Sequence, residues 1–145
     1  MEMNIKKLNE NAKIPTYGSM GAAGFDLYAC NDENIVIKPH ETVLIKTGIS
    51  LEIKEGYVGL IYARSGLATK RSLAPANKVG VIDSDYRGEI MVALHNHCDE
   101  TQSIEPYERI AQMVITPFVR VEFNEVSELS STERDNNGFG STGTK

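Results

Sequence analysis

Cysteine is scarce in this sequence, and what is present forms no pattern. Cys30 and Cys98 are the two cysteines, and they do not make a C-x-x-C pair. A disulfide framework or a zinc site built on cysteine therefore has little support, and we expect both residues to be free thiols. His95 and His97 share a strand face but lack a third ligand nearby, which favours two ordinary polar residues over a metal pair.

Long apolar runs and an excess of positive charge are also missing. No stretch of about 18 apolar residues occurs, and residues 1–14 lack the apolar core of a signal peptide. The formal net charge is -5, whereas nucleic-acid backbones and anionic lipids attract basic surfaces. We therefore expect a soluble, cytoplasmic protein that binds neither nucleic acid nor membrane directly. A polyanionic ligand would need a local pocket of positive groups.

Apolar residues alternate with polar ones along much of the chain. With 145 residues, the chain is long enough for one domain with one core. A period of two places the apolar residues on one face of a strand, and short strands separated by turn residues predict an all-β sandwich or barrel. The alternating residues are Val43, Ile45, Ile49, Leu51 and Ile53, then Val58, Leu60 and Tyr62, then Ile90, Val92 and Leu94, and finally Val119, Val121 and Phe123.

One helix is expected, over residues 65–74, with Ser65 as its N-cap and Pro75 closing it. Beyond Phe123 the chain is rich in Ser, Thr, Asn and Gly, a composition that buries too little apolar surface to order itself. We therefore expect a β-barrel domain over residues 1–123 and a mobile C-terminal tail over residues 124–145.

The start of the expected helix has the groups of an anion site. Arg64 supplies a guanidinium, Ser65 a hydroxyl, and Gly66 allows backbone N–H groups to approach a ligand. These groups suit phosphate oxygens. The alternative is an ordinary helix cap with a neighbouring arginine.

The tail has a similar ambiguity. Its glycines and hydroxyls allow close approach to a ligand, and Phe139 has no core to enter but suits stacking on a flat ring. The alternative is a plain disordered terminus.

The stretch 80–90 reads GVIDSDYRGEI and places Asp83 directly after an apolar run. Asp85 fits a residue that only caps a turn. Asp83 fits that reading less well, because an inward-pointing, unpaired carboxylate would cost several kcal/mol and so needs a partner or a purpose. An ionised carboxylate at this position suits orienting a water molecule or accepting a sugar hydroxyl.

In these stretches the sequence resembles the trimeric dUTPase family. The resemblance spans nearly the whole chain and rests on motifs in the family order: AAGFDLYA at 22–29, ARSGLA at 63–68, GVIDSDYRGEI at 80–90, ERIAQMVI at 108–115 and RDNNGFGSTG at 134–143. It implies a jelly-roll-like β-barrel that hydrolyses dUTP to dUMP and pyrophosphate. It also implies Mg²⁺ across the triphosphate, and a role in limiting uracil in DNA and supplying dUMP for thymidylate synthesis.

The resemblance also implies roles for individual residues. Asp83 would be the general base that activates the attacking water, Tyr86 would pack under the deoxyribose and exclude a 2′-hydroxyl, and Asp26 would hold Mg²⁺ through water. The uracil would be bound by Asn77, Gly80, Val81, Ile82 and Met91. The phosphates would be bound by Arg64, Ser65, Gly66 and Gln112, and from the tail by Arg134, Gly140, Ser141 and Thr142, while Phe139 stacks on the uracil.

In the family, three subunits share each active site, and the tail of one closes a site formed by the other two. The resemblance therefore implies a homotrimer. Two alternatives remain on the same fold: a dCTP deaminase-like enzyme, which would need a glutamate base in place of Asp83, and a non-catalytic regulator that senses dUTP or binds a protein. A purely structural β-sandwich is a third, which leaves the tail unexplained.

Overall fold

The computed structural model describes residues 1–133 and 135–136. No helix in this part of the chain is long and apolar enough to cross a membrane. The strands are β1 (Asn4–Lys7), β2 (Thr16–Tyr17), β3 (Phe25–Tyr28), β4 (Ile35–Ile37), β5 (Thr42–Lys46), β6 (Ile49–Glu52), β7 (Tyr57–Tyr62), β8 (Leu73–Pro75), β9 (Gly80–Ile82), β10 (Met91–Asn96), β11 (Gln102–Ile104) and β12 (Arg109–Pro117), and the helix is α1 (Ser65–Arg71).

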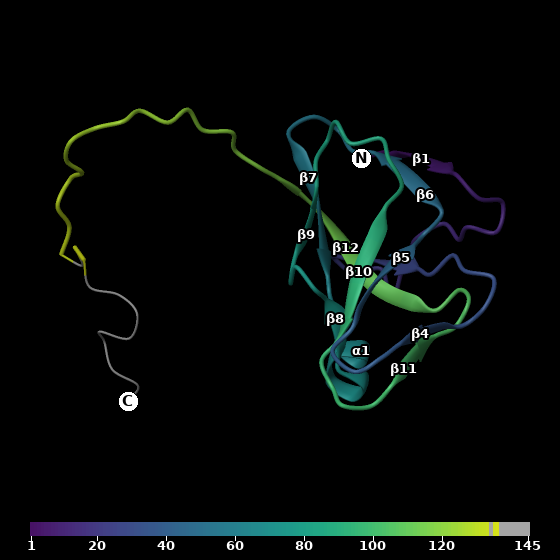
Figure 1. Cartoon of the computed structure of the whole chain (residues 1–145). Coiled ribbons are helices and arrows are strands. Elements are labelled where there is room, and N and C mark those ends of the chain that lie inside the picture. Colours follow the sequence, from purple (N-terminus) through teal and green to yellow (C-terminus); the bar gives the residue numbers. More distant parts are fainter. Residues whose placement is uncertain (134, 137–145) are drawn as a thin grey trace.

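The strands form antiparallel sheets around one core. Within the described residues, a five-stranded sheet has the order β2-β3-β12-β7-β9, a three-stranded sheet has the order β5-β10-β8, and β1-β6 and β4-β11 are two-stranded pairs. Buried apolar residues from both larger sheets, such as Met113 of β12 and Leu94 of β10, belong to a single cluster. Figure 1 shows a barrel-like body with α1 at one end. The prediction of an all-β, jelly-roll-like fold with one short helix is confirmed.

The prediction for β7 is wrong about which face is buried. Gly59 and Ile61 are the buried residues of this strand, whereas Val58 and Leu60 are half-buried and Tyr62 is exposed. Both faces of the strand are apolar, so periodicity alone does not distinguish the face that meets the core. The second apolar face is only partly covered in a single chain.

The helix is shorter than predicted. Its N-cap is Arg64 rather than Ser65, and no side chain caps it. Ser72 takes the left-handed conformation, with φ 53° and ψ 30°, and its N–H donates to the carbonyl of Leu67. The chain therefore leaves the helix after Arg71, and Pro75 lies in β8, opposite Leu94 of β10. A left-handed residue after a helix is usually glycine, so a serine there gives no stop signal in the sequence.

No strand forms over residues 119–123. β12 ends at Pro117, and the described chain that follows, to residue 133, has no helix or strand. Figure 1 shows it running away from the barrel. Val119 is 85% exposed and Phe123 is 96% exposed. Apolar and polar residues do alternate over this segment, but within one chain the apolar side chains pack against no other part of the described protein.

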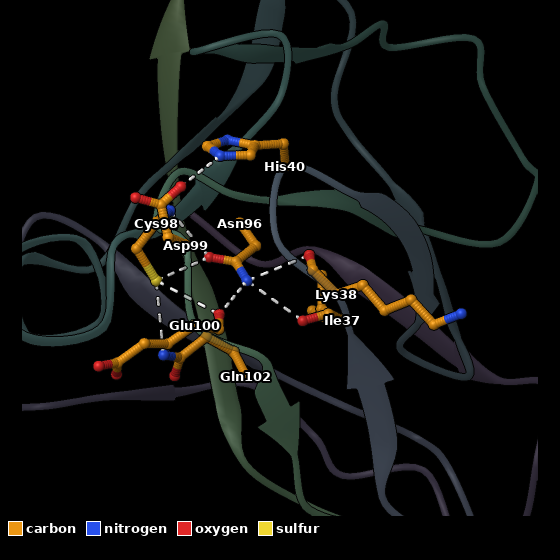
Figure 2. Close-up of polar contacts among 8 residues, drawn as sticks. All are labelled: Ile37, Lys38, His40, Asn96, Cys98, Asp99, Glu100 and Gln102. Atoms are coloured by element: carbon orange, nitrogen blue, oxygen red, sulfur yellow. Dashed lines mark hydrogen bonds and ion pairs between the residues drawn. The ribbon is translucent and has the colours of Figure 1, made fainter.

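One buried asparagine joins three parts of the barrel. Asn96, at the end of β10, is fully buried. Its amide N–H groups are shared among the carbonyls of Ile37 at 3.2 Å, Lys38 at 3.1 Å and Glu100 at 2.7 Å. Its side-chain oxygen accepts from the backbone N–H of Cys98 at 3.1 Å (Figure 2). This side chain therefore holds together β4, β10 and the turn that precedes β11.

Candidate active site

Residues 83–90 connect β9 to β10 and begin with a tight turn. β9 is an edge strand, with Ile82 opposite Gly59 of β7. The N–H of Tyr86 donates to the carbonyl of Asp83 at 3.2 Å, which closes the turn. Asp85 lies in the turn, as predicted, and the side chain of Asp83 is exposed. Asp83 therefore does not point inward, and its carboxylate is accessible to a ligand without a burial cost.

A pocket of about 270 Å³ opens beside this turn. It brings together several residues that the sequence singled out, including Asp83 and Tyr86, but Asn77 and Gly80 do not line it. Leu44 and Glu89 line it without having been predicted. Leu44 is an outward residue of β5 and carries no sequence signal, whereas Glu89 lies within the stretch that includes Asp83. The lining residues are Leu44, Val81, Ile82, Asp83, Tyr86, Glu89 and Met91.

The connection is held in place by Gly48 and by the first residues of β6. The Ser50 hydroxyl donates to the carbonyl of Arg87 at 2.7 Å. The N–H of Gly48 donates to the carboxylate of Glu89 at 2.8 Å. The N–H of Ile90 donates to the carbonyl of Ile49 at 2.9 Å. These bonds fix the backbone on which Asp83 and Tyr86 depend, since buried and partly buried hydrogen bonds of this kind restrict the chain to one path.

A second group of polar residues lies at the other end of β7. Asp26 of β3 is 9% exposed, and its carboxylate accepts from Nε of Arg64 at 2.8 Å and from Nη1 of Arg109 at 3.3 Å. Gln112 lies opposite both Asp26 and Tyr62 in the sheet. Its side-chain amide donates to the carbonyl of Ala63 at 2.9 Å.

This Asp26–Arg64–Arg109–Gln112 cluster has two guanidiniums for one carboxylate. The excess positive charge suits phosphate oxygens, which arginine binds through charge-assisted hydrogen bonds. Ser65 and Gly66 are exposed next to Arg64, with open space around Gly66. Arg109 was not predicted, because only the fold brings it to Asp26.

The donor groups fit Mg²⁺ only in part. Within residues 1–133 and 135–136, no group of three or more His, Cys, Asp or Glu residues is placed to hold a metal ion. Mg²⁺ is commonly bound by one or two carboxylates together with waters and substrate phosphates, so a protein cage is not required. The carboxylate of Asp26 keeps free lone pairs beside its two arginine partners, which allows contact with a metal-bound water.

The histidine pair does not form a metal site in the described residues. The rings of His95 and His97 lie edge to face, with centroids 4.4 Å apart. Burial lowers the pKa of His97 below its usual value, and the nearby charges of Lys78, His95 and His40 lower it further. Nδ1 of His95 bonds to the Thr42 hydroxyl at 2.8 Å. His95 lies in β10 and His97 just after it, so the two rings meet at the end of a strand.

The pocket and the arginine cluster are far apart in one chain. Ile82 lies opposite Gly59, so Asp83 follows beside Val58, while Arg64 comes six residues after Val58. At a rise of about 3.3 Å per residue, this separates Asp83 from Arg64 by about 20 Å along β7. The pairing of β10 agrees with this separation. Asn96 lies at the end of β10 that is far from Asp83, and it pairs with Leu73, which comes just after α1. The two groups therefore lie at opposite ends of the barrel (Figure 1).

The predicted tail residues Arg134, Phe139, Gly140, Ser141 and Thr142 lie outside the described residues.

Comparisons with known proteins agree on one family. A family model described as dUTPase matches residues 10–143. The chain is 52% identical over 145 residues to a deoxyuridine 5′-triphosphate nucleotidohydrolase of Hydrogenobaculum sp., covering 100% of both chains. It is 54% identical over 143 residues to the enzyme of that name from Nautilia profundicola, covering 99% of both.

A solved structure has the same fold. The dUTPase of Staphylococcus bacteriophage 80alpha with dUPNHPP is 32% identical and superimposes with a TM-score of 0.89, covering 98% of both chains. Sequence identity of 52–54% over the whole chain, together with this structural similarity, indicates a shared family and not only a shared fold. The chain belongs to the dUTPase family.

Proposed function

We propose that this protein hydrolyses dUTP to dUMP and pyrophosphate, with Asp83 as the base. The observation that carries the proposal is the turn that joins an accessible carboxylate, Asp83, to an aromatic ring, Tyr86, at the wall of one pocket. The pocket takes the uracil and the deoxyribose. The family membership and the full-length relatives named as deoxyuridine 5′-triphosphate nucleotidohydrolases support this assignment.

In the proposed reaction, Asp83 accepts a proton from a water whose oxygen attacks the α-phosphorus. The new bond joins this oxygen to the α-phosphorus, and the bond from that phosphorus to the oxygen bridging to the β-phosphorus breaks. Pyrophosphate leaves, and the proton passes from Asp83 to solvent. A carboxylate serves as the base here because the phosphorus polarises the water as it attacks.

Charge on the triphosphate requires positive groups, since phosphoryl transfer depends mainly on positioning and electrostatic stabilisation. Arg64 and Gln112 bind phosphate oxygens in this proposal, together with Ser65 and Gly66. Mg²⁺ neutralises part of the triphosphate charge when it is bound, and Asp26 would hold it through water.

Base selection depends on the rigidity of β9 and the pocket. Thymine differs from uracil by one methyl group, and a deformable apolar pocket discriminates by only about 1–3 kcal/mol for such a group. Backbone atoms of Val81 and Ile82, held in the sheet by β7, move aside less readily than side chains. Cytosine is rejected because its amine presents a donor where an acceptor is expected.

The proposal requires more than one copy of the chain. The base and the phosphate-binding groups must approach the same phosphate to within hydrogen-bond distance, yet Asp83 and Arg64 lie about 20 Å apart along β7 in one chain. We therefore propose that Asp83 of one copy works with Arg64 and Gln112 of another, within a homotrimer. Apolar residues that are exposed in the single chain and do not line the pocket support an interface: Val119 at 85%, Val121 at 58% and Phe123 at 96%.

The C-terminal residues close the site in this proposal. Arg134, Gly140, Ser141 and Thr142 bind the phosphates, and Phe139 stacks on the uracil. Closure excludes bulk water from the reacting groups, which strengthens their electrostatic interactions. In the cell, the reaction limits uracil incorporation into DNA and supplies dUMP for thymidylate synthesis.

A nucleotide panel tests the function directly. Purified protein is incubated with dUTP, dTTP, dCTP and UTP, with and without Mg²⁺, and pyrophosphate release is measured. We expect rapid release from dUTP alone and a requirement for Mg²⁺. Ammonia release from dCTP would instead indicate a deaminase, and dUTP binding without turnover would indicate a regulator.

A further inference from the structure

Gly88 and Tyr86 approach each other more closely than any side chain at position 88 would allow. A Cβ atom added at Gly88 would lie 2.4 Å from Oη, 2.5 Å from Cζ and 2.9 Å from Cε2 of Tyr86. Among the described glycines, no other has a neighbour this close; the nearest case is Gly48, at 2.8 Å. The tyrosine ring therefore rests directly on the backbone of residue 88.

Backbone conformation does not explain this glycine. Gly48 and Gly56 are the glycines with positive φ among the described residues, and Gly88 is not one of them. The freedom of glycine to adopt positive φ is therefore not what this position uses. The requirement for glycine at position 88 therefore comes from the ring of Tyr86.

The ring is fixed from its polar end as well. Oη of Tyr86 donates to the carbonyl of Glu89 at 3.0 Å. The carboxylate of Glu89 is itself held by the N–H of Gly48, and the carbonyl of Arg87 by the Ser50 hydroxyl. Tyr86 thus folds back over residues 87–89, which are anchored on both sides of Gly88 by the Arg87 carbonyl and the Glu89 carboxylate.

We infer that Gly88 is a positioning residue that sets the Tyr86 ring against the deoxyribose and so determines the rejection of ribonucleotides. The inference rests on the proposed function, in which Tyr86 excludes the 2′-hydroxyl. A methyl group at position 88 displaces the ring. Because Tyr86 is 40% exposed, the ring swings toward solvent and the fold is kept. The space for a 2′-hydroxyl then opens.

The test is Gly88→Ala, with kcat and KM measured separately for dUTP and UTP. We expect the ratio of kcat/KM for dUTP over UTP to fall by about tenfold or more, in the range that one steric contact provides. The matched control is Gly18→Ala, because a Cβ at Gly18 meets no atom within 4 Å and its φ is not positive. This control should leave the ratio unchanged.

A double-mutant cycle separates ring positioning from a general effect on the turn. In a Tyr86→Leu background the ring is absent, so Gly88→Ala should change neither the nucleotide ratio nor the thermal midpoint any further. Equal losses from Gly88→Ala in both backgrounds would overturn the inference, even if Gly88→Ala alone folds poorly. An unchanged ratio in a folded Gly88→Ala protein would also overturn it.

The two proposals fail differently. If the unmodified protein hydrolyses dUTP and UTP equally, the assigned role of Tyr86 fails, and the inference with it. If the unmodified protein discriminates but Gly88→Ala discriminates equally well, only the inference about Gly88 fails.

Discussion

Asp26 accepts a hydrogen bond from Nε of Arg64 at 2.8 Å, which ties β3 to the N-cap residue of α1. Because Nε is used in this contact, the outer face of the guanidinium keeps its Nη groups for an anion. The carboxylate therefore orients the arginine that would bind phosphate in the proposed reaction.

Asp26→Asn should weaken substrate binding. The amide keeps similar size but removes the charge that holds both arginines, and losing such a charge-assisted contact costs about 1.5–3 kcal/mol. We expect KM for dUTP to rise by about tenfold or more, with a smaller change in kcat. Steady-state kinetics measures this. Asp32→Asn, at an exposed position, is the control, and an unchanged KM in Asp26→Asn would contradict the orienting role.

Two inactive variants should restore activity when they assemble together. Asp83→Asn removes the base, and Arg64→Ala removes a phosphate-binding group at the other end of the barrel. If each site combines Asp83 of one copy with Arg64 of another, about one quarter of sites in a random equal mixture are intact. Co-expression or mixing after subunit exchange, followed by a dUTP hydrolysis assay, measures this recovery.

The control for that experiment uses two residues of one turn. Asp83→Asn mixed with Tyr86→Ala should recover no activity, because both residues always come from the same chain. Absence of recovery in the Asp83→Asn and Arg64→Ala mixture, in proteins shown to exchange subunits, would mean that one chain supplies both groups.

Asn96→Ala should destabilise the barrel strongly. The change leaves the buried carbonyl of Ile37 and the partly buried carbonyls of Lys38 and Glu100 without their donor, and we expect a loss of about 3 kcal/mol or more in the free energy of unfolding. Urea unfolding at a fixed protein concentration measures it. Cys98→Ala removes weak thiol contacts, to the Asn96 oxygen at 3.1 Å, the Glu100 carbonyl at 3.5 Å and the Gln102 amide at 3.6 Å, and should cost much less. Similar losses in both variants would disprove the central role of Asn96.

Ser72→Gly should stabilise the protein. The left-handed conformation of Ser72 is costly for a residue with a Cβ. Glycine removes this cost but adds freedom to the unfolded chain, so a net gain of about 0.5–1 kcal/mol is expected. The bond from the His97 N–H to the residue 72 carbonyl, at 2.9 Å, is unaffected. Thermal unfolding measures the gain.

Ser103→Gly is the opposite control for Ser72→Gly. Ser103 is an exposed residue in β11, where glycine adds freedom to the unfolded chain and removes no strain, so a loss of about 0.5–1 kcal/mol is expected. If both serine variants shift the thermal midpoint downward, the left-handed conformation at residue 72 is not a source of strain.

Local patterns in the chain were enough to predict strands and motifs. Alternation at Ile45, Val92 and Leu94 identified residues that are buried in β5 and β10. A strand that covers a core with one face buries every second side chain, so its sequence alone shows which residues are buried. The motif around Asp83 and Tyr86 was also readable, since both residues lie on one turn and need no distant contact to come together.

Contacts between distant segments decided the rest. Which face of β7 meets the core, where α1 ends, and that Arg109 reaches Asp26 depend on neighbours remote in the chain. The contact of Gly88 with Tyr86 joins residues only two apart, but it depends on the direction of the tyrosine side chain, which the residue types do not specify. The separation of Asp83 from Arg64 follows from the register of β9 on β7. That register is set by the pairing of two strands and is not determined by any single residue.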